Sequence, residues 1–295
     1  MDKRQTAAVV VTYNRLPLLR KCIEKLCAQT VLCDILVVNN ASTDDTASWL
    51  DGLQAEGRLQ TRNTGANLGG AGGFNYGMRW AVEAGYQYLW VMDDDCLPEA
   101  DALEKLLEAD GLLNGEYGWL SSVALWTDGS KCRMNQQKLL TGVQTRGSCL
   151  PAFQATFVSL FLRAEIVREA GLPISEFFIW GDDTEYTRRI SVRMGKPGFV
   201  VKDSVVVHAM KNNNGSNIAL DDAANLSRYA YAYRNENYLY RQEGGRGMIY
   251  FLLRCLYHTL RVLLKARDQR AARISVIWEN AIMGFRFNPP VRKID

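Results

Sequence analysis

Short apolar runs rich in β-branched residues alternate with helix-spaced segments at the start of this 295-residue chain. Residues 7–13 (AAVVVTY) form the first run, and residues 34–38 (DILVV) form the second. Apolar residues at helical spacing follow the first run between Leu16 and Ala28, and a cluster of turn-forming and helix-capping residues, 39–46, follows the second. Two such strand–helix units predict a parallel sheet of the nucleotide-binding kind.

The alternation continues to residue 95. A short strand is expected near residues 59–61, and the glycine-dense segment 67–75 (NLGGAGGFN) then opens a helix that runs through Ala84. The next strand, residues 88–92, is wholly apolar and stops at three consecutive carboxylates, residues 93–95. Strands that are buried on both faces of a parallel sheet have this composition.

The rest of the chain divides into a less regular middle part and a helical end. The expected elements are helices at residues 100–109, 165–170 and 181–194, and strands near residues 119–125, 155–162 and 199–207. A polar loop at residues 212–217 (NNNGSN) is typical of a hinge or lid. We therefore expect an α/β domain over residues 1–215, with a mostly parallel sheet flanked by helices, and a helical, basic, amphipathic region over residues 216–295.

Composition excludes several classes of protein. The chain is 47% hydrophobic and 23% charged, which is the balance of an ordinary soluble globular protein. Its seven cysteines form no CxxC pair, which argues against a disulfide framework and a zinc site. The longest charge-free stretch, residues 147–162, contains Pro151, so no membrane-spanning segment is expected. Residues 1–4 (MDKR) lead into no secretory h-region, which favours a cytoplasmic location.

The net charge of +3 conceals an asymmetry. Residues 244–295 carry ten Lys and Arg against three acids, or +7, so residues 1–243 sum to −4. In a helical projection one face of this region is apolar and the opposite face is basic, with Arg254, His258, Arg261 and Lys265 on the basic side. Two interpretations stay open: a helix packed on the catalytic domain or a sister subunit with a solvated basic side, or attachment to an anionic membrane surface.

The three consecutive carboxylates stand where open α/β sheets bind their ligands, at the carboxyl end of a buried strand. Carboxylates this close repel one another unless a cation compensates them. A solvated turn is the alternative, but five apolar residues before three acids favour a metal site. Alternate members of the triplet can point the same way, so Asp93 and Asp95 are the better candidates to hold Mg²⁺ or Mn²⁺ on a diphosphate.

Two further segments have compositions that suit ligand binding. The glycines of residues 67–75 permit close backbone approach at a helix start, where N–H groups favour anions, although a glycine-rich turn with tight packing is an equal alternative. The segment matches neither a P-loop nor a dinucleotide fingerprint. Trp180 precedes three acids of the WGDDTE segment at a helix start; capping explains some of them, whereas a Trp beside paired carboxylates is how sugar sites are often built. His208, at a strand end, is by itself more typical of a structural residue.

Taken in order, these segments resemble the inverting family-2 glycosyltransferases of the GT-A fold. The resemblance covers residues 7–208 through VVVTYNR, LVVNNASTDDT, NLGGAGGFNYG, WVMDDD and WGDDTEYTRR, followed by His208. With Tyr233-Arg234-Asn235 downstream, the chain looks most like the galactofuranosyltransferase branch, with rhamnosyltransferases close behind. The resemblance implies a GT-A nucleotide-binding fold with a C-terminal helical extension.

The resemblance also implies roles for individual residues. The nucleotide-sugar donor would be bound by residues Thr12, Tyr13, Arg15, Asn39, Asn67, Gly69, Gly70 and Asp94. A Mn²⁺ or Mg²⁺ ion would be held by Asp93, Asp95 and His208. The acceptor would be seated by Trp180 and Asp182, with Asp183 as the catalytic base. Asn39 departs from the pattern of many relatives, which have Asp before Asn here; because an amide can pair with either base, uridine and thymidine donors both stay open.

The function that the resemblance implies is metal-dependent, inverting transfer of galactofuranose from UDP-galactofuranose to a hydroxyl of a glycan or polyprenyl-linked saccharide. Rhamnose transfer from a dTDP donor is the first alternative. A nucleotidyltransferase would need a basic residue near a triphosphate, and the early loop offers only Arg15. A non-catalytic nucleotide-sugar or glycan-binding module would have no need of Asp183. The acidic body and the lack of an aromatic-basic motif argue against nucleic acid as a partner.

Overall fold

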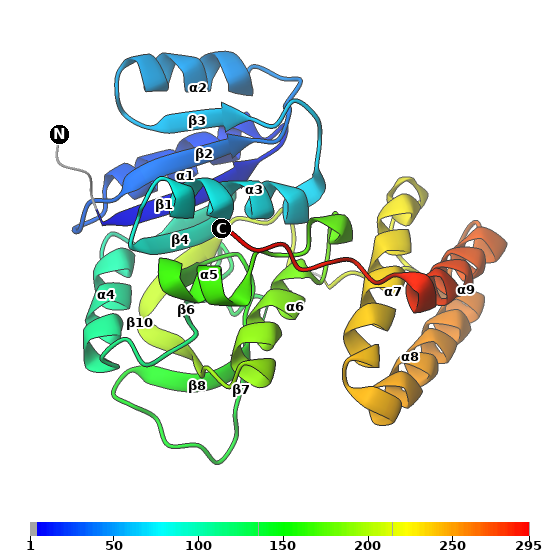
Figure 1. Ribbon diagram of the computed structural model, residues 1–295. Helices are drawn as coiled ribbons and strands as arrows, with labels where there is room; N and C mark the ends of the chain where they lie inside the picture. Colours follow the sequence, from blue (N-terminus) through cyan, green and yellow to red (C-terminus); the bar gives the residue numbers. More distant parts are fainter. Residues whose placement is uncertain (1–4, 135, 214, 295) are drawn as a thin grey trace.

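The computed structural model describes residues 5–134, 136–213 and 215–294. The residues 1–4 that bear on the expected location, and Asn214 of the expected polar loop, lie outside the described residues. The described strands form one sheet with the order β3-β2-β1-β4-β9-β6-β10-β8-β7, and β5 pairs with β10. Figure 1 shows this sheet flanked by helices, with three long C-terminal helices to one side.

The first half of the sheet is parallel, as the alternating pattern predicts. Its elements are β1 (Thr6–Thr12), α1 (Leu16–Cys27), β2 (Asp34–Asn39), α2 (Thr46–Ala55), β3 (Gln60–Asn63), α3 (Gly69–Glu83) and β4 (Tyr88–Asp93). In register, Thr12 pairs with Asn39, and Val11 pairs with Asp93. The carboxyl ends of three neighbouring strands therefore meet at one edge, which places these polar side chains together.

The second half of the sheet is largely antiparallel, so the sheet is mixed rather than mostly parallel. Its strands are β5 (Cys96–Pro98), β6 (Trp119–Leu125), β7 (Lys138–Leu139), β8 (Cys149–Gln154), β9 (Leu160–Arg163) and β10 (Gly198–His208). The single strand expected at residues 155–162 is wrong: β8 ends at Gln154, and β9 begins at Leu160. Residues 155–159 instead bend the chain, because β9 pairs antiparallel with β4 whereas β8 pairs with β10.

The helices of this half cover both faces of the sheet. They are α4 (Ala102–Leu112), α5 (Ala164–Ala170) and α6 (Asp182–Arg188), with a 3-10 turn, η1 (Ser175–Phe177), before α6. The helix expected at residues 181–194 is shorter, since a π-helical turn, η2 (Arg189–Arg193), replaces its second half. Helices α1, α2 and α4 share one buried core with the sheet, and α3 and α5 share the other.

The C-terminal region is helical, as expected. It consists of a 3-10 turn, η3 (Ala223–Asn225), and the helices α7 (Leu226–Arg241), α8 (Gly244–Lys265) and α9 (Arg270–Arg286). These helices have their own core, which includes Tyr229, Phe251 and Ile277. Residues 287–294 are extended and return to the sheet domain, where Leu172 N–H donates to the Arg292 carbonyl at 2.8 Å. This return is visible in Figure 1 as the red segment that runs toward α5. The boundary at residue 215 stays a prediction.

The orientation of α8 contradicts the expectation of a solvated basic side. Its leucine-rich face is exposed, with Leu253 59% and Leu264 70% accessible. Its opposite side faces α7, where Arg254 pairs with Glu236 at 2.9 Å. The physical reason is that α7 presents Glu236 to Arg254 and Tyr233 to His258, so these two side chains are satisfied inward and the apolar face is left unpartnered.

Helix α8 also contradicts the expectation that the chain has no segment able to cross a membrane. It is 22 residues long, with a mean hydropathy of 1.3 over its most apolar 18-residue window, and only 22% of that window is buried. By length and composition it is long and apolar enough to span a bilayer. The charge-free criterion missed it because Arg254 and Arg261 interrupt the apolar run.

Tight packing between α3 and the sheet gives a testable consequence. A Cβ at Gly77 would lie 2.6 Å from Val9 Cγ1 and 2.9 Å from Val38 Cγ2. We expect Gly77→Ala to lower the free energy of unfolding by about 1–3 kcal/mol, the usual cost of overpacking a core. Chemical denaturation of the purified protein measures this change.

Gly52, in the middle of α2, provides the matched control, because a Cβ there meets nothing within 4 Å. Gly52→Ala should leave stability unchanged or raise it by about 0.5–1 kcal/mol, since alanine favours a helix interior. Equal destabilisation by both substitutions would contradict this account of the packing.

Candidate active site

Two carboxylates and a histidine converge at the carboxyl edge of the sheet. Asp93 ends β4, Asp95 follows two residues later, and His208 ends β10, where it pairs with Cys96 of β5. One ligand atom from each of Asp93, Asp95 and His208 lies within 4.8 Å of the others. The structure therefore brings together the three residues that the resemblance assigns to a metal.

Burial and mutual repulsion dominate the electrostatics of this cluster. The pKa of Asp93 is raised well above its ordinary value by burial and by the charge of Asp95. Burial alone would raise the pKa of Asp95, but contact with His208 and Arg15 outweighs it, so this pKa is lowered. Burial alone would lower the pKa of His208, but contact with Asp95 raises it. The cluster thus favours added positive charge.

The donor set fits a hard divalent cation. His208 Nε2 lies 3.1 Å from Asp95 Oδ1, yet this contact lacks hydrogen-bond geometry. Asp95 Oδ1 and His208 Nδ1 are buried atoms without a hydrogen-bond partner among the described residues. Buried polar atoms are almost always satisfied, and two carboxylates with an imidazole form a donor set that can bind a divalent cation. These observations indicate divalent metal binding without identifying the ion.

The middle carboxylate of the triplet points elsewhere. Asp94 Oδ2 accepts a hydrogen bond from the Thr12 hydroxyl at 2.7 Å, and Asp94 Oδ1 lies 3.4 Å from Arg15 Nη1. Burial raises the pKa of Asp94 to about 6, against the opposing charge of Arg15. Arg15 also donates to Asp95 Oδ2 at 2.8 Å, so one guanidinium links two of the three acids.

The two asparagines at the end of β2, Asn39 and Asn40, have separate partners. Asn39 is buried, and its Oδ1 accepts from Ser42 N–H at 2.9 Å. Asn40 ties the glycine-rich segment to the sheet: it donates to the Gly69 carbonyl at 3.0 Å and accepts from Leu68 N–H at 3.0 Å. Asn67 Oδ1 accepts from Gly69 N–H at 2.9 Å. The segment is therefore positioned by amide side chains.

The glycines of α3 serve two purposes. Gly69 has a positive φ of 70°, and a Cβ there would clash with the backbone of Phe178. A Cβ at Gly73 would lie 2.5 Å from Val11 Cγ1, so this glycine permits close packing on β1. Gly70, by contrast, has open space beside it and lines the cavity described below. The packing interpretation of the segment is thus confirmed at Gly69 and Gly73, and ligand binding by Gly70 stays a prediction.

Trp180, Asp182 and Asp183 lie in a constrained turn before and at the start of α6. Phe178, Trp180 and Gly181 have positive φ values of 62°, 67° and 89°. Burial, followed by the charge of Asp183, raises the pKa of Asp182 to about 8. Burial raises the pKa of Asp183 to about 6, although N–H donation from Thr184 opposes it. Strained backbone and raised carboxyl pKa values are typical of functional sites.

Asn235, to which the resemblance assigns no individual role, holds this turn in place. The Asn235 amide of α7 lies within 2.9 to 3.1 Å of the carbonyl oxygens of Phe177, Ile179 and Trp180. Arg234 donates to the Glu176 carbonyl at 2.6 Å. The one sequence signal at this position is an amide among the tyrosines of α7, and its role becomes visible only with the carbonyl partners in place.

A cavity of about 440 Å³ joins the acidic cluster to the Trp180–Asp183 turn. Some residues to which the resemblance assigns a role line this cavity: Arg15, Gly70, Asp93, Asp95, Trp180, Asp182, Asp183 and His208. The others do not line it: Thr12, Tyr13, Asn39, Asn67, Gly69 and Asp94. The first set brings the Asp93–Asp95–His208 cluster and the paired carboxylates to one space.

Comparison with known proteins agrees with this arrangement. Residues 7–110 match the family described as Glycosyl transferase family 2. The chain carries a family 2 glycosyltransferase domain. It is 29% identical over 269 residues to galactofuranosyltransferase GlfT1 of Mycobacterium tuberculosis. The matched region covers 82% of this chain and 84% of that protein. The protein is therefore a glycosyltransferase rather than a non-catalytic binding module.

Solved structures show the same fold. S. aureus TarS matches 96% of this chain with a TM-score of 0.55 at 14% identity. This chain spans 44% of that TarS chain. Mannosyltransferase PcManGT from Pyrobaculum calidifontis, solved with GDP-Man and Mn²⁺, matches 96% of this chain and 74% of its own, with a TM-score of 0.54 at 15% identity. The GT-A architecture is thus confirmed.

The acidic cluster predicts metal-dependent nucleotide binding. Asp95→Asn removes a negative charge and one ligand oxygen from the cluster, so we expect Mn²⁺-dependent affinity for UDP to fall at least tenfold. Isothermal titration with UDP, with and without Mn²⁺, measures this change.

Asp203→Asn is a matched control, since Asp203 is an exposed residue of β10, the strand that ends at His208. It should titrate like the wild type. Unchanged UDP affinity in Asp95→Asn would exclude Asp95 from the metal site.

Proposed function

We propose that the protein transfers galactofuranose from UDP-galactofuranose to a hydroxyl group of a glycan or lipid-linked saccharide, with inversion at the anomeric carbon. The observation that carries this proposal is the single cavity that holds both the Asp93–Asp95–His208 cluster and the Asp182–Asp183 pair. The similarity to GlfT1 over 82% of the chain supports the choice of sugar.

The cavity provides separate positions for donor and acceptor. Asp93, Asp95 and His208 would hold a divalent ion, which when bound neutralises the charge of a leaving diphosphate. Arg15 contacts this cluster, and Gly70 lines the same cavity; both are suited to contact the donor, Arg15 through its guanidinium and Gly70 through its open backbone.

At the other end of the cavity, Asp183 accepts a proton from the acceptor hydroxyl as that oxygen attacks the anomeric carbon. Attack from the side opposite the leaving group inverts the configuration. Asp182, whose raised pKa keeps it protonated at neutral pH, donates a hydrogen bond to the acceptor. Trp180 offers an aromatic face to the sugar ring and is itself braced by Arg228, whose guanidinium lies 5.1 Å from the ring centroid.

We also propose that the enzyme is a cytoplasmic protein attached peripherally to the inner face of the cell membrane. The outer face of α8 exposes Ile249, Leu253 and Leu264, each more than half accessible. Exposed basic side chains stand near the two ends of this face, at Arg246 and at Lys265, Arg267 and Arg270. An apolar face flanked by cations fits an anionic bilayer interface. Because its other side packs on α7, α8 is placed to lie along the membrane rather than to cross it.

The proposed base gives the sharpest test of mechanism. Asp183→Asn keeps the shape of the side chain but cannot accept the proton, so we expect kcat to fall by about 10²- to 10⁴-fold. UDP affinity should stay within about twofold, since Asp183 lies at the acceptor end. Initial rates with UDP-galactofuranose and a saccharide acceptor measure kcat, and titration with UDP measures the affinity. The same assay with dTDP-rhamnose as donor tests the choice of sugar. Substantial turnover in the variant would exclude Asp183 as the base.

The raised pKa of Asp183 predicts a pH profile. A base acts only when deprotonated, so kcat/KM should rise with pH through about 6, the value to which burial raises this pKa. An unperturbed aspartate would give an acid limb near pH 4. The profile of kcat/KM between pH 4 and 8, measured where the fold is intact by circular dichroism, distinguishes the two.

The membrane proposal predicts lipid-dependent sedimentation. Leu253→Gln with Leu256→Gln removes two exposed apolar side chains and should abolish binding to vesicles of anionic phospholipid, whereas neutral vesicles should bind the wild type weakly. Leu139→Gln with Leu140→Gln, at exposed positions of the sheet domain, is the matched control and should bind like the wild type. Failure of the wild type to bind anionic vesicles would overturn the proposal.

A further inference from the structure

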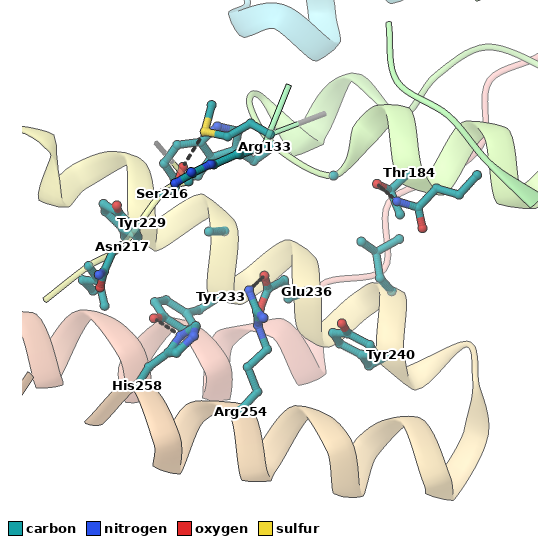
Figure 2. A pocket seen from close by; sticks show the side chains of 18 of the residues that line it. Arg133, Thr184, Ser216, Asn217, Tyr229, Tyr233, Glu236, Tyr240, Arg254 and His258 are labelled. Atoms are coloured by element: carbon teal, nitrogen blue, oxygen red, sulfur yellow. Dashed lines mark hydrogen bonds and ion pairs between the residues drawn. The ribbon is translucent and has the colours of Figure 1, made fainter. Parts of the chain in front are cut away.

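A second cavity, of about 420 Å³, adjoins the catalytic one. Helices α7 and α8 supply much of its wall, and the β6–β7 connection supplies Arg133. It shares five lining residues with the catalytic cavity, namely Met134, Gln154, Trp180, Gly181 and Thr184. Figure 2 shows Arg254 and His258 of α8 reaching toward α7, with Arg133 on another side and Thr184 at a third. The two cavities thus meet at the turn that carries the proposed acceptor residues.

The lining of this second cavity is strongly cationic. Its basic side chains are Arg133, Lys138, Arg188, Arg254 and Arg261, against one carboxylate, Glu236. Arg254 is neutralised by Glu236 through two contacts of 2.9 Å, and Arg188 by Glu243 at 2.6 Å. Within the described part of the chain, Arg133, Lys138 and Arg261 form no ion pair. Three cations without a carboxylate partner therefore line one partly open cavity, with Arg133 and Lys138 exposed and Arg261 half-buried.

His258 and Tyr233 also line the cavity and add no charge to it. His258 Nδ1 lies 2.8 Å from the Tyr233 hydroxyl. Burial, together with the charges of Arg254 and Arg261, lowers the pKa of His258 to about 4, so this ring is neutral and adds no charge. Like charges gathered in a partly enclosed space are unfavourable unless an anion enters.

The inference rests on the proposed function, in which the acceptor hydroxyl reaches Asp183. The next residue, Thr184, lines both cavities. We propose that the second cavity is an anion subsite of the acceptor, and that it binds the phosphate or diphosphate group that joins the acceptor saccharide to its carrier. Arginine forks match phosphate oxygens, and a cavity that adjoins the reaction site can hold an anionic group of the acceptor that lies apart from the reacting hydroxyl.

The position of α8 agrees with this assignment. One side of the helix lines the cavity with Arg254, His258 and Arg261, and the other exposes the apolar face. A carrier with an anionic head and a hydrocarbon tail needs these two environments close together.

The donor diphosphate is a poor candidate for the same space, because the proposed metal ligands lie in the other cavity.

A binding experiment tests the subsite without requiring turnover. The probes are an alkyl diphosphate linked to a saccharide, the same saccharide as an uncharged alkyl glycoside, and inorganic pyrophosphate, all titrated calorimetrically in EDTA so that metal-dependent binding is absent. The variant is Arg133→Gln with Arg261→Gln, which removes two unpaired cations. Lys25→Gln with Lys202→Gln, at exposed positions outside both cavities, makes the same change in net charge and is the control.

We expect wild type and control to bind the diphosphate-linked saccharide at least tenfold more tightly than the uncharged glycoside, and the Arg133/Arg261 variant to lose this preference. The affinity of UDP in Mn²⁺ should not change. Equal binding of both saccharides by the wild type, or an unchanged preference in the variant, would overturn the proposal, as would binding of pyrophosphate alone with no gain from the saccharide. If galactofuranose transfer fails but the preference holds, the donor assignment is wrong and the subsite stands.

Discussion

The structure depends on how three carboxylates are accommodated at the end of one buried strand. Asp93, Asp94 and Asp95 are too close to remain charged without compensation, and the fold provides it from different directions. Thr12, at the end of β1, and Arg15, just before α1, turn Asp94 away from its neighbours, while Arg15 and His208 contact Asp95. Thr12 and His208 end different strands of the sheet. The pairing of these strands therefore brings the compensating side chains to the carboxylates. The atoms left without partners then define where a cation fits.

A second constraint links the helical region to this edge. The turn before α6 has strained backbone at Phe178 and Trp180, and a strained turn persists only where surrounding contacts hold it. Asn235 and Arg234 of α7 provide those contacts through backbone carbonyls. The C-terminal helices therefore do more than extend the catalytic domain, since they position the residues proposed to receive the acceptor. Residues 287–294 reinforce this link by returning to the sheet domain.

The sequence predicted most of what is local. Strands of β-branched residues that end in polar clusters indicated the parallel half of the sheet and the positions of Asp93 and Asp95, because strand ends must share an edge. It failed where pairing is non-local. Nothing in residues 155–162 announces that β9 joins β4 in the opposite direction, and an amide such as Asn235 acquires meaning only when its carbonyl partners arrive from 55 to 58 residues away.

Helix α8 shows the same limit in another form. A helical projection correctly separates its leucines from its cations, but amphipathicity alone does not say which side faces inward. The usual expectation, that the apolar side is buried, fails here because Glu236 and Tyr233 of α7 offer partners to Arg254 and His258. Satisfying buried polar groups inward leaves an apolar face that water solvates poorly. The free energy cost of exposing this apolar face to water is reduced if the face contacts lipid. The inward pairing of Arg254 and the proposed membrane contact therefore follow from the same orientation of α8.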